Sequence, residues 1–181
     1  MKNTFNDALA NEYEQGSKEV HHSVRTIKLS TTTFNPVLQT FDPKKEPNAK
    51  LIASFQKDIS WADHIVVFYP TWWTAMPALL KGFFDKVFSP GFAYKFIKGK
   101  PMPKKLLKGK SAHIITTLDA PPLIYKVLYR SAGTFMLKKG IFKFCGIKPV
   151  KTTLIGSVKF SNETKRTKWL VQMRKYGHKA R

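Results

Sequence analysis

The most regular hydrophobic pattern of the chain covers residues 62–88 and predicts a strand, a turn and a helix. Residues 64–69, HIVVFY, are mostly apolar and rich in β-branched and aromatic side chains, which is typical of a strand covered on both faces. Pro70 ends this strand, and the apolar residues that follow the turn recur at helical spacing. The turn between them contains two adjacent tryptophans, Trp72 and Trp73.

The other periodic segments alternate helices with strands along the chain. Helical spacing predicts helices over residues 4–21, 49–60 and 161–176, and one or two helices over 121–143 that break near Gly133. Runs of apolar or alternating residues predict strands over residues 24–29, 111–118 and 150–156. Helices that alternate with strands indicate a parallel sheet with helices on both faces, so the predicted fold class is α/β.

Smaller signals set the ends of these elements and the loops between them. Asn3 or Thr4 is a plausible N-cap of the first helix, and Ser161 of the last. Residues 30–47 and 89–110 are polar or basic, contain proline, and are predicted to be loops. Long loops of the second kind are often functional.

The length and composition of the chain favour a single soluble domain. Its 181 residues are enough for one sizeable core, and no apolar run is long enough to span a bilayer. A secretory signal is not recognisable either, so we expect a cytoplasmic protein. The single cysteine, Cys145, excludes an internal disulfide and is expected to pack as a small hydrophobe. No Cys/His cluster has the spacing of a metal site.

The net charge of +21 suggests two classes of partner, nucleic acid and anionic lipid. The lysines and arginines are spread along the chain, however, and few aromatic residues lie among them as platforms for bases. A solvated basic surface is therefore favoured over a specific nucleic-acid site, although nucleic-acid binding stays open as a third hypothesis. A basic surface would also attract phosphorylated cofactors such as NADPH.

The tryptophan turn follows the carboxyl end of a predicted parallel strand, which is where open α/β sheets bind ligands. Its backbone N–H groups and its two indole rings would suit a planar aromatic cofactor such as a flavin. Trp72 and Trp73 would equally well close the top of the core or an oligomer interface. The local pattern does not choose between these alternatives.

The run YPTWWTAMPALLKGFFDKVF, which begins at Tyr69, and the following PGFAYKF resemble the flavodoxin-like NAD(P)H:quinone oxidoreductases and related flavin-dependent NAD(P)H oxidoreductases. The matches SAHIITT at residues 111–117 and IFKFCGIKPVKTTLIGSVK at residues 141–159 extend the resemblance over nearly the whole chain. The resemblance implies a flavodoxin-like parallel sheet, FMN or FAD as the cofactor, and NAD(P)H as co-substrate. It also implies hydride transfer through the flavin to a quinone or similar acceptor, in a homodimer with its pockets at the interface.

The resemblance starts without the first strand of such a sheet. In the family, a hydrophobic strand and a glycine-containing turn precede the motif that residues 2–6, KNTFN, resemble. This strand is central in the order 2-1-3-4-5, so its loss would leave unpaired backbone groups that cost about 1–3 kcal/mol each. We expect one N-terminally truncated flavodoxin-like domain over residues 1–181, as a fragment or the product of an internal start. A partner chain that supplies the strand, and strands that close up differently, are the alternatives.

The resemblance also implies cofactor contacts in three segments. Thr4, Phe5 and Asn6 match the phosphate-binding turn at a helix N-terminus, although simple capping explains Thr4 and Asn6 as well. Backbone donors in the tryptophan turn would stabilise negative charge on reduced flavin. The expected contacts of the flavin ring are Pro70, Thr71, Trp72, Trp73 and Thr74 in that turn, and Thr116, Thr117, Leu118 and Asp119 in the next loop.

Two positions depart from the pattern of the quinone reductases. Leu118 and Asp119 stand where those enzymes have two glycines, and Asp119 would be unfavourable beside reduced flavin unless it points away. Tyr125 is the candidate catalytic residue, since it lies near the position where the quinone reductases have a tyrosine that can hydrogen-bond at the flavin. Its offset is imperfect and the expected histidine does not follow, so packing is the favoured role of Tyr125.

The predicted function is therefore that of a flavin-dependent NAD(P)H oxidoreductase of the quinone-reductase type. A loop that reaches toward the partner subunit in the family is matched by Phe92, Ala93, Tyr94 and Phe96. The alternative is a binding or regulatory protein that keeps the fold but has lost catalysis with its first strand and half of its phosphate loop.

Overall fold

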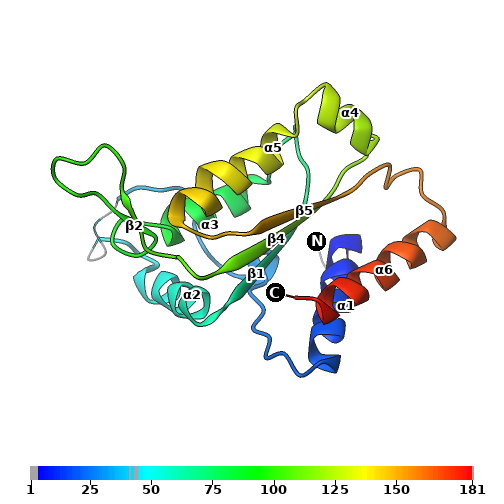
Figure 1. Ribbon diagram of the computed structural model, residues 1–181, viewed down its shortest axis with the longest axis horizontal. Coiled ribbons are helices and arrows are strands. Elements are labelled where there is room, and N and C mark those ends of the chain that lie inside the picture. The colour runs from blue at the N-terminus through cyan, green and yellow to red at the C-terminus, as the bar shows by residue number, and fades with distance from the viewer. Residues whose placement is uncertain (1–3, 41, 43–44, 181) are drawn as a thin grey trace.

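Three parallel strands form the centre of the computed structural model, which describes residues 4–40, 42 and 45–180 (Figure 1). The order in this sheet is β1-β4-β5, with β1 at His64–Pro70, β4 at Ser111–Thr117 and β5 at Val150–Ile155. His64 pairs with Ser111, and Ala112 pairs with Val150. Because β4 lies between two partners, all of its residues after Ser111 are buried.

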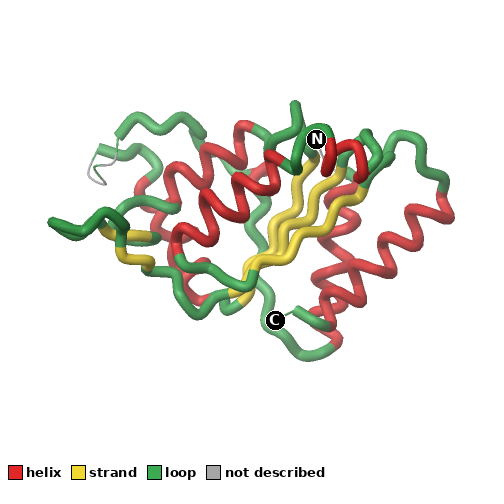
Figure 2. Tube along the Cα trace, turned by 45° about the horizontal axis from the view of Figure 1, so that its top comes forward, coloured by secondary structure: helices red, strands yellow, loops and turns green. Residues whose placement is uncertain are grey.

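Helices cover both faces of this sheet (Figures 1 and 2). On one face, α1 (Phe5–Glu19) packs against α6 (Glu163–His178). The other face carries α2 (Ala49–Trp61), α3 (Ala78–Val87) and the continuous pair formed by α5 (Ala132–Phe135) and the π-helical η2 (Met136–Lys143). The short α4 (Pro122–Val127) lies beyond the carboxyl ends of the strands.

The sheet separates two hydrophobic clusters because neighbouring residues of a strand face opposite sides. Ile114 of β4 packs in the cluster with α2, α3 and η2. The next residue, Ile115, packs with Leu9 of α1 and Met173 of α6. The predicted α/β class and parallel sheet are therefore confirmed, and so are the predicted strands at β1, β4 and β5.

The predicted strand at residues 24–29 is wrong, since this segment is irregular and leads into a single 3₁₀ turn, η1 (Leu29–Thr31). Its alternating polar side chains bind the neighbouring helices instead of flanking a sheet. Arg25 pairs with Asp58 of α2, and Lys28 pairs with Asp7 of α1. Alternation alone does not make a strand when no neighbour offers its backbone for pairing.

Other boundaries differ from the predictions in detail. The N-cap of α6 is Asn162 rather than Ser161, and that of α1 is Thr4, whereas Asn3 lies outside the described residues. The predicted break near Gly133 comes slightly earlier, at two consecutive residues with left-handed backbone, Arg130 and Ser131. The predicted loop at residues 89–110 contains a small antiparallel pair, β2 (Tyr94–Lys95) and β3 (Lys104–Lys105).

Two expectations about composition can be compared with the described chain. Cys145 is buried and packs in the larger cluster, as predicted. In the part of the chain that the structure describes, no helix is long and apolar enough to cross a membrane.

Glycines bring α1 and α6 into close contact. A Cβ atom on Gly16 would overlap the backbone of Arg174, and one on Gly177 would overlap the carbonyl of Tyr13. The two helix backbones therefore pack directly on one another at this crossing. At the end of the crossing, Glu19 forms an ion pair with Arg174, and Nε2 of His178 contacts the same carboxylate.

One edge of β1 has no strand beside it in the described chain. The amide of Thr71 donates to the carbonyl of Thr117 at 2.7 Å, and the amide of Ser111 donates to the carbonyl of Asp63 at 2.9 Å. Backbone groups of a strand point alternately to its two sides, so those of Val66 and Phe68 point to the open edge.

We therefore expect the amides of Val66 and Phe68 to exchange with solvent about tenfold or more faster than those of Val67 and Tyr69, which point toward β4. Hydrogen exchange read residue by residue by NMR measures the difference. Equal protection of the two sets would show that another strand covers this edge in solution.

Candidate functional site

The carboxyl ends of β1 and β4 are joined by threonine hydrogen bonds. The Oγ1 atom of Thr116 donates to the carbonyl of Tyr69 at 2.9 Å and lies 2.8 Å from Oγ1 of Thr71. Since the proton of Thr116 is used in the first bond, Thr71 is the donor in the second. These bonds fix the start of the tryptophan turn against the end of the neighbouring strand.

The first turn of α1 reaches the same place. The side-chain amide of Asn6 donates to Oγ1 of Thr117 at 2.9 Å. Its other polar atom, Oδ1, is buried and has no hydrogen-bond partner among the described residues. A buried acceptor without a donor is costly, so this atom is suited to a ligand that brings an N–H or O–H group.

Thr4 acts as the cap of α1 rather than as a free donor. Its backbone N–H and its hydroxyl both donate to the carboxylate of Asp7, at 2.8 and 2.9 Å, and the amide of Asp7 donates back to Oγ1 of Thr4. The hydrogen bond from Lys28, together with those from Thr4, lowers the pKa of Asp7 to about 2. The free donors of this first turn are therefore the amides of Phe5 and Asn6.

The tryptophan turn is a tight two-residue reversal. Trp72 and Ala75 exchange two backbone hydrogen bonds, of 2.9 and 2.8 Å. Between them, Trp73 and Thr74 both have positive φ, 45° and 63°, which is the conformation of a type I′ turn. Glycine or asparagine usually fills such positions, so the turn is strained.

The exposure of the two indoles decides against one of the alternatives for Trp72 and Trp73, the closing of the core. Trp73 is 95% exposed at the tip of the turn, and Trp72 is 56% exposed. Neither indole closes the top of the core. The amides of Trp72 and Ala75 are used inside the turn, which leaves those of Trp73 and Thr74 as its available donors.

Tyr125 supports this turn from behind. It is 2% exposed, and its hydroxyl donates to the carbonyl of Thr74 at 3.0 Å and accepts from the amide of Thr134 at 3.3 Å. A Cβ atom on Gly133 would overlap the same carbonyl of Thr74. The role of Gly133 could not be predicted from the sequence, because it depends on a contact with Thr74, which is distant along the chain. The contact of Thr134 with the hydroxyl of Tyr125 spans only nine residues, but the sequence pattern does not show it.

The loop after β4 resolves the difficulty raised by Asp119. The carboxylate of Asp119 accepts a hydrogen bond from the amide of Lys159 at 3.1 Å, so it is directed toward the turn that follows β5. Leu118 is buried, and its amide donates to the carbonyl of Ile155. Neither residue has a positive φ, so this loop does not need the backbone freedom of glycine.

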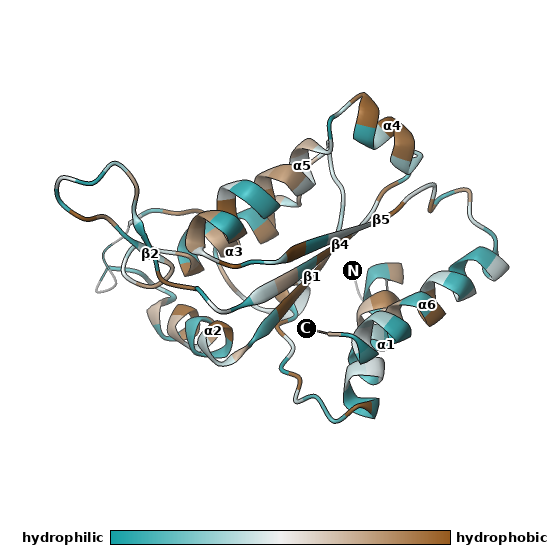
Figure 3. Ribbon diagram, viewed as in Figure 1, coloured by the Kyte–Doolittle hydropathy of each residue, from teal (hydrophilic) through white to brown (hydrophobic). Residues whose placement is uncertain are grey.

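A large apolar surface lies beside this end of the sheet. Leu123, Val127 and Leu128 in and after α4 are between 68% and 71% exposed, and Phe135 is 58% exposed. Figure 3 shows the brown colour of α4, in contrast to the mostly polar surface of α6. Large apolar side chains exposed on and after one short helix indicate a surface that contacts another molecule.

The sequence-predicted residues thus meet in one region, though in different ways. The first turn of α1, Thr71, Thr116 and Thr117 are joined directly, and Pro70 ends β1 opposite Thr117. Trp72 and Trp73 border the region at its exposed side. In the described chain, no group of three or more His, Cys, Asp or Glu side chains is arranged to hold a metal ion.

Comparison with known proteins gives a consistent picture. Residues 1–177 match the model of a protein family described by its flavodoxin-like fold. The chain is 34% identical over 159 residues to an uncharacterized NAD(P)H oxidoreductase of Haemophilus influenzae, a match that covers 86% of this chain and 78% of the relative. It is 25% identical to NAD(P)H dehydrogenase [quinone] 1 of Rattus norvegicus, over 87% of this chain but only 65% of that enzyme.

Solved structures agree in fold. Smu.1420 from Streptococcus mutans UA159 superposes with a TM-score of 0.86 at 32% identity, and the match covers 99% of this chain and 94% of the other. An FMN-dependent NADH-azoreductase from Bacillus anthracis, solved in complex with FMN, has a TM-score of 0.74 at 14% identity over 98% and 92% of the two chains. The predicted flavodoxin-like fold is confirmed, and the named relatives are oxidoreductases, as expected.

Removal of the Tyr125 hydroxyl should loosen the tryptophan turn. Tyr125→Phe leaves the carbonyl of Thr74 and the amide of Thr134 without this partner, so we expect the free energy of unfolding to fall by about 1–3 kcal/mol. Denaturant unfolding measures this change. Tyr129→Phe, at a residue 44% exposed, is the matched control and should change stability by less than about 0.5 kcal/mol. Equal effects of the two changes would contradict the bracing role.

Proposed function

Because the chain belongs to the family with the flavodoxin-like fold, we propose that it is a flavin-dependent NAD(P)H oxidoreductase whose cofactor lies at the carboxyl ends of β1 and β4. The observation that carries the proposal is the bond from Asn6 to Thr117, which brings the first turn of α1 to the end of β4 beside the tryptophan turn. Ligands of open α/β sheets bind at this end of the strands. A bound flavin would accept a hydride from NAD(P)H and pass it to a quinone or similar acceptor.

The residues at this end of the sheet fit a flavin. The amides of Phe5 and Asn6 and the dipole of α1 would hold a phosphate group, while Thr4 and Asp7 keep the helix start in place. The unpaired Oδ1 of Asn6 would accept a hydrogen bond from the cofactor.

The ring of the cofactor would lie along the tryptophan turn. The amides of Trp73 and Thr74 are its available donors, and donors placed there would stabilise negative charge on the ring. The carboxylate of Asp119 accepts a hydrogen bond from the amide of Lys159, so it is held toward the turn after β5 and would not repel that negative charge. We propose that Tyr125 acts through Thr74 as a positioning residue, since both its hydrogen bonds are used within the protein.

We favour FMN over FAD, since a solved structure of this fold holds FMN and a single phosphate suffices for the short donor set of α1. The quinone acceptor is proposed by similarity to relatives such as the rat enzyme. A cytoplasmic location remains a prediction of the sequence.

A binding or regulatory protein without catalysis is the second proposal, and two observations favour it. The open edge of β1 leaves backbone groups of the sheet without a ladder partner in the described chain. The donors of Thr4 are used within the capping box and are not available for a phosphate. The two proposals differ in whether the folded protein binds flavin at all.

The flavin proposal is tested by titrating the purified protein with FMN and following quenching of flavin fluorescence. Asn6→Ala removes both polar atoms of that side chain at the site, so we expect FMN to bind about tenfold more weakly. Asn11→Ala, at an exposed position of the same helix, should leave the affinity unchanged. NADH and NADPH oxidation with a soluble quinone then measures turnover. A folded protein that binds neither FMN nor FAD would exclude the flavin-dependent enzyme and leave the second proposal.

We also propose a homodimer, with the apolar surface formed by Leu123, Val127, Leu128 and Phe135 in its interface. Exposure of these large apolar side chains to water is unfavourable in free energy, so their burial against a second copy would be favoured. Tyr125 of α4 bonds to Thr74, so this surface borders the tryptophan turn, and the partner would cover the proposed flavin site from that side. The match of residues 92–96 to a loop that reaches the partner subunit adds support, with Phe96 67% exposed and Ala93 buried.

The change Val127→Glu would place a charge within this surface, and we expect the dimer to dissociate at least about tenfold more readily. Light scattering after size-exclusion chromatography measures the mass over a dilution series. Val171→Glu, at an exposed residue of α6, adds the same charge elsewhere and should leave the dimer intact. A wild-type protein that is monomeric at all concentrations would contradict this part of the proposal.

A further inference from the structure

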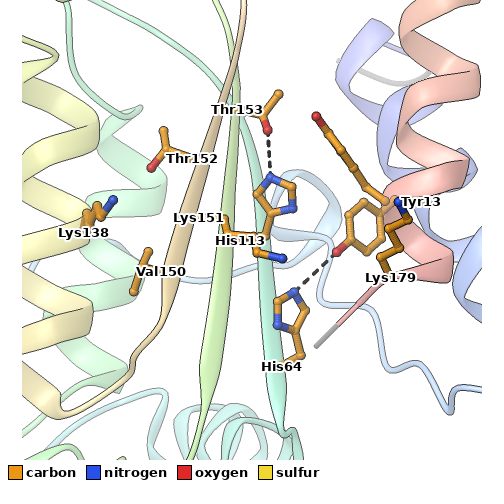
Figure 4. Close-up of a pocket in the computed structure, with 10 residues that line it drawn as sticks. Tyr13, His64, His113, Lys138, Val150, Lys151, Thr152, Thr153 and Lys179 are labelled. Atoms are coloured by element: carbon orange, nitrogen blue, oxygen red, sulfur yellow. Dashed lines mark hydrogen bonds between the residues drawn. The ribbon is translucent and has the colours of Figure 1, made fainter.

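A cavity lies toward the opposite end of the sheet, where the strands begin. Its volume is about 510 Å³, and it runs along the β5 edge of the sheet, with Tyr13 and Lys179 on the side of α1 and α6 and Lys138 on the side of η2 (Figure 4). Volumes of this size are typical of sites for small organic ligands. The residues that line it are Tyr13, His64, His113, Lys138, Val150, Lys151, Thr152, Thr153, Tyr176 and Lys179.

Two histidines form the wall of this cavity on the sheet side. His113 is 5% exposed, and its Nε2 atom lies 2.8 Å from Oγ1 of Thr153. His64 has Nδ1 at 2.7 Å from the hydroxyl of Ser111 and Nε2 at 3.4 Å from the hydroxyl of Tyr13. In Figure 4 the second ring nitrogen of His113 points toward α1, away from Thr153. Within the described chain this nitrogen makes no hydrogen bond, and His113 lines the cavity.

Cationic groups surround the two imidazoles. Lys151 pairs in register with His113 across β4 and β5, and Lys179 comes from the end of α6. Lys138 lines the cavity from the far side of β5 (Figure 4). None of the residues that line the cavity is an aspartate or a glutamate, although the chain contains 11 of these residues. Among the described residues, the lining therefore carries positive charge without an acidic side chain.

The histidines respond to this environment. Burial, together with the charge of Lys151 and of the neighbouring imidazole or His22, lowers the pKa of both His64 and His113 to about 4. Burial raises the pKa of Tyr13, so its hydroxyl stays protonated. At neutral pH both imidazoles are uncharged, and a negative charge placed among them would favour their protonation.

Aromatic rings line the side of the cavity that faces the helices. The ring centroid of Tyr176 lies 5.2 Å from that of His113, and the ring centroid of Tyr13 lies 6.0 Å from it. Both are edge-to-face contacts. Tyr13 is only 4% exposed and also packs edge-on against Phe68, so Tyr176 offers the more accessible ring. The site thus combines aromatic surface with cations.

We propose that this cavity binds a small aromatic carboxylate, with its carboxylate beside Lys151 and Lys179 and its ring against Tyr176. The aromatic ring accounts for Tyr176 in the lining, and the anionic group supplies a counter-ion to the lysines. The site is separate from the carboxyl-end region, since His64 and Lys151 stand at the beginnings of β1 and β5. The proposal does not depend on flavin binding.

Binding at this site takes up protons. In the free protein both histidines are neutral at pH 7, and a carboxylate beside them raises their pKa toward the ordinary range of histidine. The groups that face them are Tyr13 from α1, His22 from the segment after α1, Lys151 from β5, and Tyr176 and Lys179 from α6. The cations among them disfavour protonation, and a bound carboxylate favours it. We therefore expect the affinity to rise as the pH falls from 7.5 to 5.5.

The test uses benzoate as the probe and the Cε1–H resonances of the histidines, read by NMR, as the measurement. Benzoate should cause saturable shifts at His64 and His113 but not at His178, which lies at the end of α6 and pairs with Glu19. Benzamide keeps the ring without the charge, and acetate keeps the charge without the ring, so each should bind about tenfold or more weakly than benzoate.

Variants of Lys151 identify the cation that is involved. Lys151→Gln should weaken benzoate binding about tenfold, and Lys151→Arg should restore most of it. Lys151 is exposed, so neither change should unfold the protein. Lys57→Gln, at an exposed position of α2, removes the same charge elsewhere and should leave the binding unchanged.

Three results would overturn the proposal. One is the absence of a saturable shift at His64 and His113. Another is benzamide and acetate binding as well as benzoate, and the third is an equal effect of Lys57→Gln and Lys151→Gln. The shifts at His64 and His113 are measured without flavin, so failure of the oxidoreductase proposal would leave this one unaffected.

Discussion

The pairing of β4 with a parallel strand on each side is the constraint from which the rest of the structure follows. Because both ladders are parallel, β1, β4 and β5 begin at one end of the sheet and finish at the other. The loops after β1 and β4 therefore meet, and Thr71 can bond to Thr116. The side chains near the strand starts meet in the same way, which brings His64 close to Ser111 and His113 close to Thr153. Each end of the sheet thus has its own group of polar residues.

The position of α1 depends on a second contact, with α6. Gly16 and Gly177 allow the two backbones to touch, and this crossing sets α1 across the face of the sheet. As a result Asn6 reaches Thr117 at one end of the helix, while Tyr13, two turns later, reaches His64 near the other end of the sheet. One helix therefore contributes both to the region at the carboxyl ends of the strands and to the cavity.

Much of this arrangement could be predicted from the sequence, because the buried strands and amphipathic helices have clear periods. The strands β1, β4 and β5 and the first turn of α1 lie where the pattern predicted them. The predicted strand at residues 24–29 is wrong because a strand needs a neighbouring strand to pair with. A hydrophobic pattern contains no information about that neighbour. The role of Thr4 depends on its neighbour in the same way. Its donors could bind a phosphate or cap the helix, and in the structure both bind the carboxylate of Asp7.

Contacts between distant segments were beyond the sequence for a related reason. The role of Tyr125 depends on Thr74, and that of His113 depends on Thr153 and on lysines that the sequence places among many others. A net charge of +21 makes any single lysine uninformative, and only the fold shows which of them face a cavity without a carboxylate. The basic composition has a local meaning there, because the described lining of the cavity contains lysines beside His113 and no acidic side chain. An anion bound at this place would lower the repulsion among those charges.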